Sequence, residues 1–89
     1  MITVLFQKQN YKLIITDHAL IRMKIRGISE GDLIKVIETG EIKPKNERGR
    51  FWVYKRLNGR KDNDVCTSVK IEKPHLIVIT TLITWRPKE

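Results

Sequence analysis

Cysteines, aromatic residues and long apolar runs are all scarce in this 89-residue sequence. Its one cysteine, Cys66, excludes an internal disulfide and any metal site built on several thiolates. Aromatic residues make up 7%, and no apolar run approaches the roughly 18 residues that span a membrane. The first residues lack a basic stretch and a small-residue cleavage site, so we expect no signal peptide. These absences predict a cytoplasmic protein with no membrane partner.

Positive charge, in contrast, is abundant and unevenly placed. The formal net charge is +8, and most of it lies between Lys43 and Lys61, interleaved with aromatic residues. Such a mixture suits a nucleic-acid surface, because cations neutralise phosphates and rings stack on bases. A solvated hairpin with a few core aromatics would give the same pattern. The residues predicted to bind RNA are Arg48, Arg50, Trp52, Tyr54, Arg56, Arg60 and Trp85.

Two consecutive helices are expected early in the chain. The first runs from Asp17 for about ten residues; Thr16 or Asp17 can cap its first amides, and Gly27 suits a left-handed C-terminal cap. The second begins after Ser29, whose side chain can cap it together with Asp32, and it ends at Gly40. The link between the helices is short, so we expect a helical hairpin.

The remaining segments have the alternation of β-strands. Short β-like runs precede the first helix, and from residue 41 onward the period of the apolar residues is two. In residues 50–57 one face carries Phe51, Val53, Lys55 and Leu57, and the other carries the basic and aromatic residues Arg50, Trp52, Tyr54 and Arg56. Lys73-Pro74 breaks the next strand, and residues 76–84 are apolar on both faces, which predicts a central strand. The expected fold is an α+β single domain over residues 1–89. It consists of N-terminal strands and a two-helix hairpin on one face of a four- to five-stranded antiparallel sheet. The other face of the sheet is left open for a ligand or partner.

The first predicted helix carries a stripe that could perform chemistry. His18, Arg22 and Arg26 are spaced four apart, so they share one slowly drifting side of the helix. An imidazole moves protons near neutral pH, and guanidiniums bind phosphate oxygens. This combination suits phosphoryl transfer, although a basic solvent-facing helix surface explains it equally simply. The residues expected to face the core instead are Ala19, Leu20 and Met23.

No metal or other cofactor is expected. His75 is the only other histidine, and Asp62 and Asp64 form only a loose carboxylate pair. Neither fits a metal-ligand template. Cys66 falls on the polar face of its strand with no histidine beside it in sequence, so a plain thiol is expected there and not a nucleophile.

The segment from residue 15 to residue 29 contains His-Ala, Arg-Met and Arg-Gly-Ile-Ser in that order. It resembles the opening of the domain-of-unknown-function family 4258, and the resemblance extends over residues 15–84. That family has been grouped with the barnase–EndoU–colicin–RelE assemblage of RNA-cutting toxins. The resemblance therefore implies a RelE-like fold, metal-independent RNA cleavage and an antitoxin as partner. The matching motif positions are His18, Arg22 and Arg26, and general position in the sheet adds Lys55, Arg56 and Thr81.

Two main hypotheses follow. In the first, the protein is a small endoribonuclease toxin that leaves a 2′,3′-cyclic phosphate, with His18, Arg22, Arg26, Lys55 and Thr81 as catalytic residues. In the second, it is a non-catalytic module that binds RNA or a partner protein through its basic residues. A third alternative is a scaffold subunit, in which edge strands pair into a homodimer.

Overall fold

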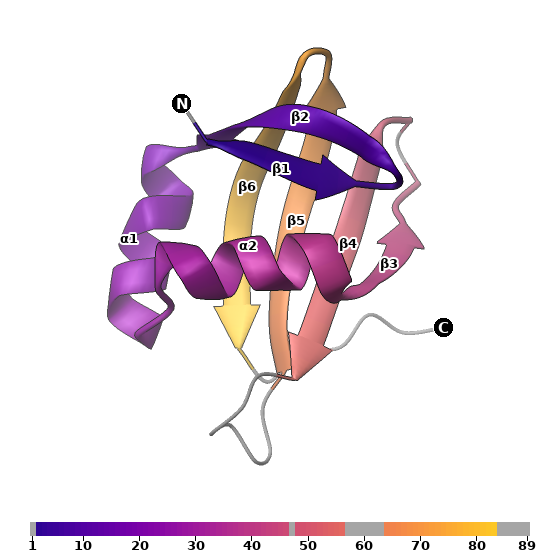
Figure 1. Ribbon diagram of the computed structural model, residues 1–89. Coiled ribbons are helices and arrows are strands. Elements are labelled where there is room, and N and C mark those ends of the chain that lie inside the picture. The colour runs from indigo at the N-terminus through magenta and orange to yellow at the C-terminus, as the bar shows by residue number, and fades with distance from the viewer. Residues whose placement is uncertain (1, 47, 57–63, 84–89) are drawn as a thin grey trace.

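A computed structural model describes residues 2–46, 48–56 and 64–83 of the chain. The described residues form six strands and two helices (Figure 1). In chain order the elements are β1 (Thr3–Phe6), β2 (Gln9–Ile15), α1 (Asp17–Arg26), α2 (Glu30–Thr39), β3 (Glu41–Pro44), β4 (Arg50–Arg56), β5 (Asp64–Glu72) and β6 (His75–Ile83).

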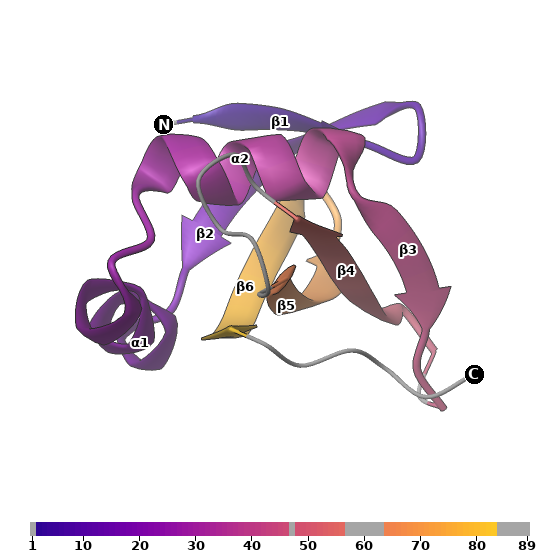
Figure 2. The same cartoon turned by 90° about the horizontal axis from the view of Figure 1, so that it is seen from below.

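All six strands join one strongly curved sheet in the order β1-β2-β6-β5-β4-β3. Neighbouring strands are antiparallel except β2 and β6, which run parallel and are the only such pair among the described strands. The sheet closes halfway into a barrel, and α2 lies inside the curve (Figures 1 and 2). We call the side that faces α2 the concave face and the other side the convex face.

The expected four- to five-stranded antiparallel sheet with a helical hairpin, and with it the RelE-like fold, is therefore wrong. The N-terminal segment supplies two strands to a mixed sheet, because β2 pairs with the C-terminal β6. The helices do not pack side by side: α1 lies along β6, whereas α2 crosses the concave face in a different direction (Figure 2). Ile28, in the link between them, is buried in the core and turns the chain inward.

The predicted ends of α1 are confirmed. The side-chain oxygen of Thr16 accepts a hydrogen bond from the backbone N–H of Ala19 and lies 3.0 Å from the carbonyl oxygen of Val78 on β6. Gly27 has a φ of +68°, which glycine adopts without strain, and the N–H of Ile28 donates to the carbonyl of Met23. These contacts fix the start of α1 against β6.

The predicted start of α2 is also confirmed. Ser29 accepts from the N–H of Asp32, and the Asp32 carboxylate accepts from the N–H of Ser29, which completes a capping box. The apolar residues of α2 then face the concave side of the sheet at helical spacing. The fully or almost fully buried ones are Leu33, Val36 and Ile37.

The core fills the space between α2 and the concave face. Phe6 is its largest fully buried side chain, and its ring makes edge contacts with the rings of Phe51, at 5.6 Å, and Tyr11, at 6.3 Å. The hairpin of β1 and β2 covers α2 from the other side, where the N–H of Leu5 donates to the Glu38 carboxylate. Burial on this scale, at about 25 cal/mol per Å² of apolar surface, is the main force that holds the fold.

Strand register assigns each side chain of β4 to a face. Phe51 pairs with Val69 and Val53 with Thr67, on the concave face. Trp52 pairs with Ser68 on the convex face. The predicted split of β4 into one apolar and one basic–aromatic face is confirmed for the residues described. The Lys73-Pro74 break and the central position of β6 are confirmed as well.

Candidate nucleic-acid interface

The convex face of the sheet gathers most of the described cations of the C-terminal half. Lys43 pairs with Trp52 across β3 and β4, and Arg50 pairs with Lys70 across β4 and β5, so their side chains share this side. Neither helix covers it, because α2 lies on the concave face and α1 beside β6 (Figures 1 and 2). We define the basic–aromatic face as Lys43, Lys45, Arg50, Trp52, Tyr54, Arg56 and Lys70.

Lys45 organises the centre of this face. Its backbone N–H donates to the carbonyl of Arg50, which extends the register of β3 by one residue. Its ammonium donates to the hydroxyl of Ser68 at 3.1 Å and lies 4.3 Å from the centroid of the Trp52 ring. A cation over an indole ring is attracted by the negative face of the ring. Lys45 therefore holds Trp52 in a defined position, half-buried and at the surface of the sheet.

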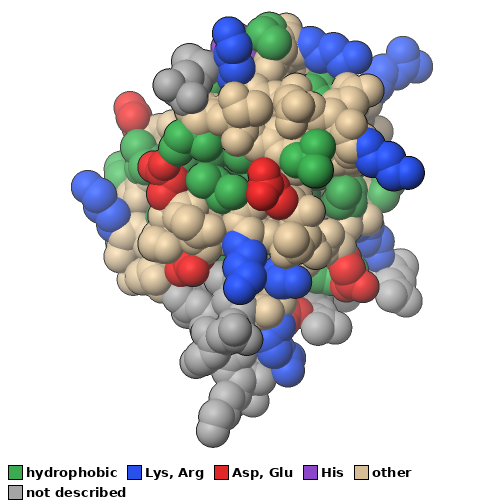
Figure 3. Space-filling view, in the orientation of Figure 1, with side chains coloured by type: hydrophobic (Ala, Val, Ile, Leu, Met, Phe, Trp, Pro, Cys, Tyr) green, Lys and Arg blue, Asp and Glu red, His purple; other side chains and the backbone are tan. Residues whose placement is uncertain are grey.

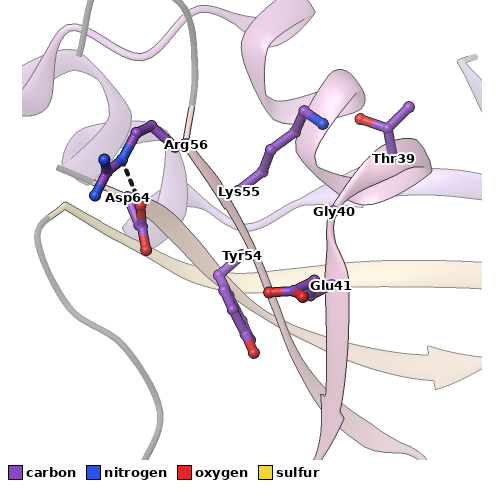
Figure 4. Close-up of a pocket in the computed structure, with 7 residues that line it drawn as sticks. All are labelled: Thr39, Gly40, Glu41, Tyr54, Lys55, Arg56 and Asp64. Atoms are coloured by element: carbon purple, nitrogen blue, oxygen red, sulfur yellow. Dashed lines mark hydrogen bonds and ion pairs between the residues drawn. The ribbon is translucent and has the colours of Figure 1, made fainter. Parts of the chain in front are cut away.

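At the end of β4 the face meets a small cleft of about 260 Å³ (Figure 4). Arg56 lines the cleft, and its Nε donates to the buried carboxylate of Asp64 at 3.3 Å. Arg56 is paired with Asp64 and Lys70 with Glu72, at 3.1 Å, so these two cations add less net positive charge to the face than their number suggests. Glu41 also lies on this side of the sheet, because it pairs with Tyr54. The residues that line the cleft are Thr39, Gly40, Glu41, Tyr54, Lys55, Arg56 and Asp64.

Lys55, predicted as a catalytic residue, lies on the concave face and not with Trp52. Its side chain points toward the last turn of α2, near Thr39 (Figure 4). That turn carries no basic residue of its own, and the C-terminal end of a helix has partial negative charge. Lys55 therefore has a structural explanation: it supplies the cation that α2 lacks.

The stripe on α1 is present but partly turned toward the sheet. His18 is exposed, whereas Arg22 and Arg26 are half-buried on the side of the helix that packs along β6. Ala19 and Met23 are buried there, as predicted. The prediction that Leu20 faces the core is wrong, because 39% of Leu20 is exposed.

Thr81 is placed where a substrate cannot reach it directly. It pairs with Thr67 on the concave face and is fully buried, and its hydroxyl has no hydrogen-bond partner among the described residues. It lies on β6, next to α1, whereas Lys55 lies on β4, two strands or roughly 10 Å away. The structure thus brings Arg22, Arg26 and Thr81 onto neighbouring elements and leaves Lys55 apart.

The other predicted RNA-binding residues fall into two groups. Arg48 is exposed in the turn between β3 and β4, so its position is compatible with the basic–aromatic face. Arg60 and Trp85 lie outside the described residues. The predicted RNA-binding residues did not include three members of the face: Lys43, Lys45 and Lys70. The β-strand alternation from Glu41 onward could have indicated Lys43 and Lys45.

Cys66 lies beneath the basic–aromatic face and pairs with Tyr54. Burial, and secondarily the negative charge of Asp64, raise the pKa of the thiol to about 12. The thiol is therefore protonated at neutral pH, which agrees with the plain thiol predicted there. Across the part of the chain that the structure describes, no three His, Cys, Asp or Glu side chains gather into a possible metal site.

The side of the molecule that carries α2 is mixed in charge. Figure 3 shows Asp and Glu side chains near the middle of this view and most Lys and Arg side chains around its rim. Three acids belong to α2, against the single cation Lys35: Glu30, Asp32 and Glu38. The charge of the described C-terminal half is by contrast strongly positive, with eight Lys and Arg and two Asp and Glu between residues 43 and 83.

This fold and this face define a small, basic domain with a helix held inside a half-closed mixed sheet. The chain belongs to the family described as Domain of unknown function (DUF4258), whose model matches residues 15–83. Comparisons with curated proteins and with solved structures found no match. Within the described residues, neither helix has the length and apolar character needed to cross a membrane.

Proposed function

We propose that the protein binds single-stranded RNA on its basic–aromatic face. The observation that carries this proposal is the strand register, which places Trp52 and Tyr54 on one side of the sheet among Lys43, Lys45 and Arg50. Cations at this spacing can contact successive phosphates, while the rings stack on bases. The net charge of +8 favours the approach of a polyanion.

The shape of the face favours a single strand over a duplex. Trp52 and Tyr54 are two residues apart on β4, so their rings are offset by roughly 7 Å along the strand. Bases must be unstacked and accessible to lie on such rings, as they are in single-stranded loops and ends. The major groove of duplex DNA admits a helix or a two-stranded ribbon, and a six-stranded sheet is wider than either.

The binding proposal predicts a steep dependence on salt. The affinity of the wild-type protein for a single-stranded RNA of mixed sequence should fall linearly with salt on logarithmic axes. Each phosphate contact contributes about 0.7 to the slope. We expect a slope of about 2 to 4, measured by fluorescence anisotropy, and weaker binding to a duplex of the same length. Equal affinity for duplex and single strand, or binding that does not change with salt, would contradict the proposal. Single-stranded DNA in parallel reports whether the ribose hydroxyl contributes.

A second candidate function, metal-independent RNA cleavage, rests on the stripe of α1. His18 is exposed one helical turn before Arg22, so a phosphate held by Arg22 would lie within reach of the imidazole. His18 would then take the proton of a ribose 2′-hydroxyl, while Arg22 and Arg26 stabilise the charge on phosphorus. The product would be a 2′,3′-cyclic phosphate. In that case the protein would be the toxin of a toxin–antitoxin pair.

We propose binding ahead of cleavage because of the positions of Lys55 and Thr81. Lys55 points toward the last turn of α2, and Thr81 is enclosed, so neither supports the stripe directly. If the stripe cleaves RNA, wild-type protein in EDTA should leave cyclic phosphate ends, and His18→Ala should lower the rate by at least a hundredfold. Because His18 is exposed, this variant should fold normally. If the wild-type protein retards RNA in gels but does not cut it, cleavage is excluded and RNA binding remains as the function.

A further inference from the structure

The outer side of α1 carries three large aliphatic residues that the fold does not cover. The exposed fractions are 39% for Leu20, 58% for Ile21 and 70% for Ile25. Ile21 and Ile25 lie on the side of α1 away from Ala19 and Met23, which pack toward the sheet, and Leu20 lies at the edge between the two sides. A helix on the surface of a domain is normally polar on the side away from the core. Contiguous exposed aliphatic residues of this kind mark sites of interaction with another molecule.

Basic residues surround these aliphatic side chains. Lys24 is exposed and falls between Leu20 and Ile21 around the helix, where its methylene stem continues the apolar surface. Arg22 borders Ile25 on the other side. The third cation of α1, Arg26, lies on the side toward β6, and the one acid, Asp17, lies on the outer side one turn before Leu20 and Ile21. The surroundings of Ile25 and Lys24, toward the C-terminal end of the helix, therefore carry the positive charge. We define the outer face of α1 as Leu20, Ile21, Lys24 and Ile25.

We propose that the outer face of α1 binds an amphipathic helix of a partner protein whose apolar stripe is flanked by Asp and Glu. Ile21 and Ile25 are one turn apart and Leu20 widens the surface, which matches the i and i+4 anchors of a helix laid along another. The cations around the stripe select acidic flanks by charge complementarity. Residues of the basic–aromatic face take no part, so this proposal is independent of RNA binding.

The same observations disfavour two other occupants. A second copy of this chain would bring two cationic helices together on molecules that each carry a net charge of +8. A lipid surface is the third candidate, but α1 lacks the Trp and Phe residues that anchor helices at membrane interfaces. An amphipathic helix with acidic flanks can cover the aliphatic residues of α1 and pair with the cations beside them.

The test uses the full chain and a labelled helical peptide with Leu at every third or fourth position and Glu on the flanks. Fluorescence anisotropy at 0.15 M salt gives its affinity for each variant. We expect Ile21→Gln combined with Ile25→Gln to weaken binding at least tenfold, and Lys24→Glu to weaken it about fivefold. All three side chains are exposed, so the variants should fold. The matched control, Leu5→Gln with Ile42→Gln, removes exposed aliphatic residues elsewhere and should change affinity less than twofold.

Two control peptides separate the contribution of the apolar stripe from that of the acidic flanks. A peptide with Ser in place of every Leu keeps the charge, and one with Lys in place of every Glu keeps the apolar stripe; both should bind at least tenfold more weakly. Equal binding of the Ser peptide, or equal losses in the matched control variant, would overturn the proposal. So would a wild-type dimer in sedimentation equilibrium that Ile21→Gln with Ile25→Gln dissociates, or binding to anionic phosphatidylglycerol vesicles without binding to the acidic peptide.

Discussion

Trp52→Ala should weaken the binding of single-stranded RNA by about 5- to 150-fold, because stacking of a base on an aromatic ring contributes about 1–3 kcal/mol. The indole is half-buried on the convex face, and the ammonium of Lys45 lies over its ring. Trp52→Phe keeps a ring in this place and should retain affinity within about fivefold. Anisotropy titrations at one fixed salt concentration give all three values.

Phe51→Leu is the matched control for this prediction. Phe51 is next to Trp52 on β4, but its ring points to the concave face and contacts Phe6. This change should lower the free energy of unfolding by about 1 kcal/mol while leaving RNA affinity within twofold. If Phe51→Leu and Trp52→Ala weaken binding equally, the loss reflects stability and not stacking, and the assignment of the face fails.

The cations of the basic–aromatic face should determine how steeply the affinity for RNA falls with salt. Lys43→Gln with Arg50→Gln should lower the slope by about 1.4, since each lost phosphate contact removes about 0.7. Lys8→Gln with Lys35→Gln removes the same charge from exposed positions off the face and should leave the slope unchanged. Equal changes in the two double variants would mean that only the total charge matters.

Gly40→Ala should lower the free energy of unfolding by about 3 kcal/mol, among the largest effects of any single methyl group in this chain. Gly40 is the one residue between α2 and β3, so the chain turns there without a loop. A Cβ atom at this position would lie 2.5 Å from the carbonyl oxygen of Val36 and 2.7 Å from that of Tyr54. Both are backbone atoms, so relief requires β3 to move away from β4.

Gly31→Ala provides the control, because it adds the same methyl group at the other end of α2. The nearest atom to its Cβ would be the hydroxyl oxygen of Ser29 at 3.8 Å, an ordinary contact. Alanine is also the better helix former, so this variant should gain about 0.5–1 kcal/mol. Urea unfolding measures both variants. A Gly40→Ala protein as stable as wild type would show that β3 is not held where the structure has it.

The sequence predicted the local structure well. The caps of both helices were predictable because Thr16, Ser29, Asp32 and Gly27 act on backbone groups only a few residues away. The two faces of β4 followed from alternation alone. Each of these features depends on residues that are close in the chain, and their spacing can be read directly from the sequence.

The arrangement of these elements was not predictable in the same way. Parallel pairing of β2 with β6 joins residues more than sixty positions apart, and alternation within a strand does not name its partner. The side of α1 that faces β6 is set by packing between elements, and with Ala19 and Met23 buried there Leu20 is left at the exposed edge of the helix. Lys55 was assigned to catalysis from its general position in the sheet that the family resemblance implies, and the sequence does not show that it faces the end of α2.

The most direct test of RNA binding on the basic–aromatic face is an NMR titration of the wild-type protein with a short single-stranded RNA, followed through its backbone amides and Trp indoles. We expect the largest shifts in residues 43–56 and 64–70, with the Trp52 indole among them, and we expect 0.5 M salt to reverse them. Shifts confined to α1, at His18 through Arg26, would move the RNA site to the helix stripe and favour cleavage. The absence of shifts even at low salt would contradict RNA binding by this protein.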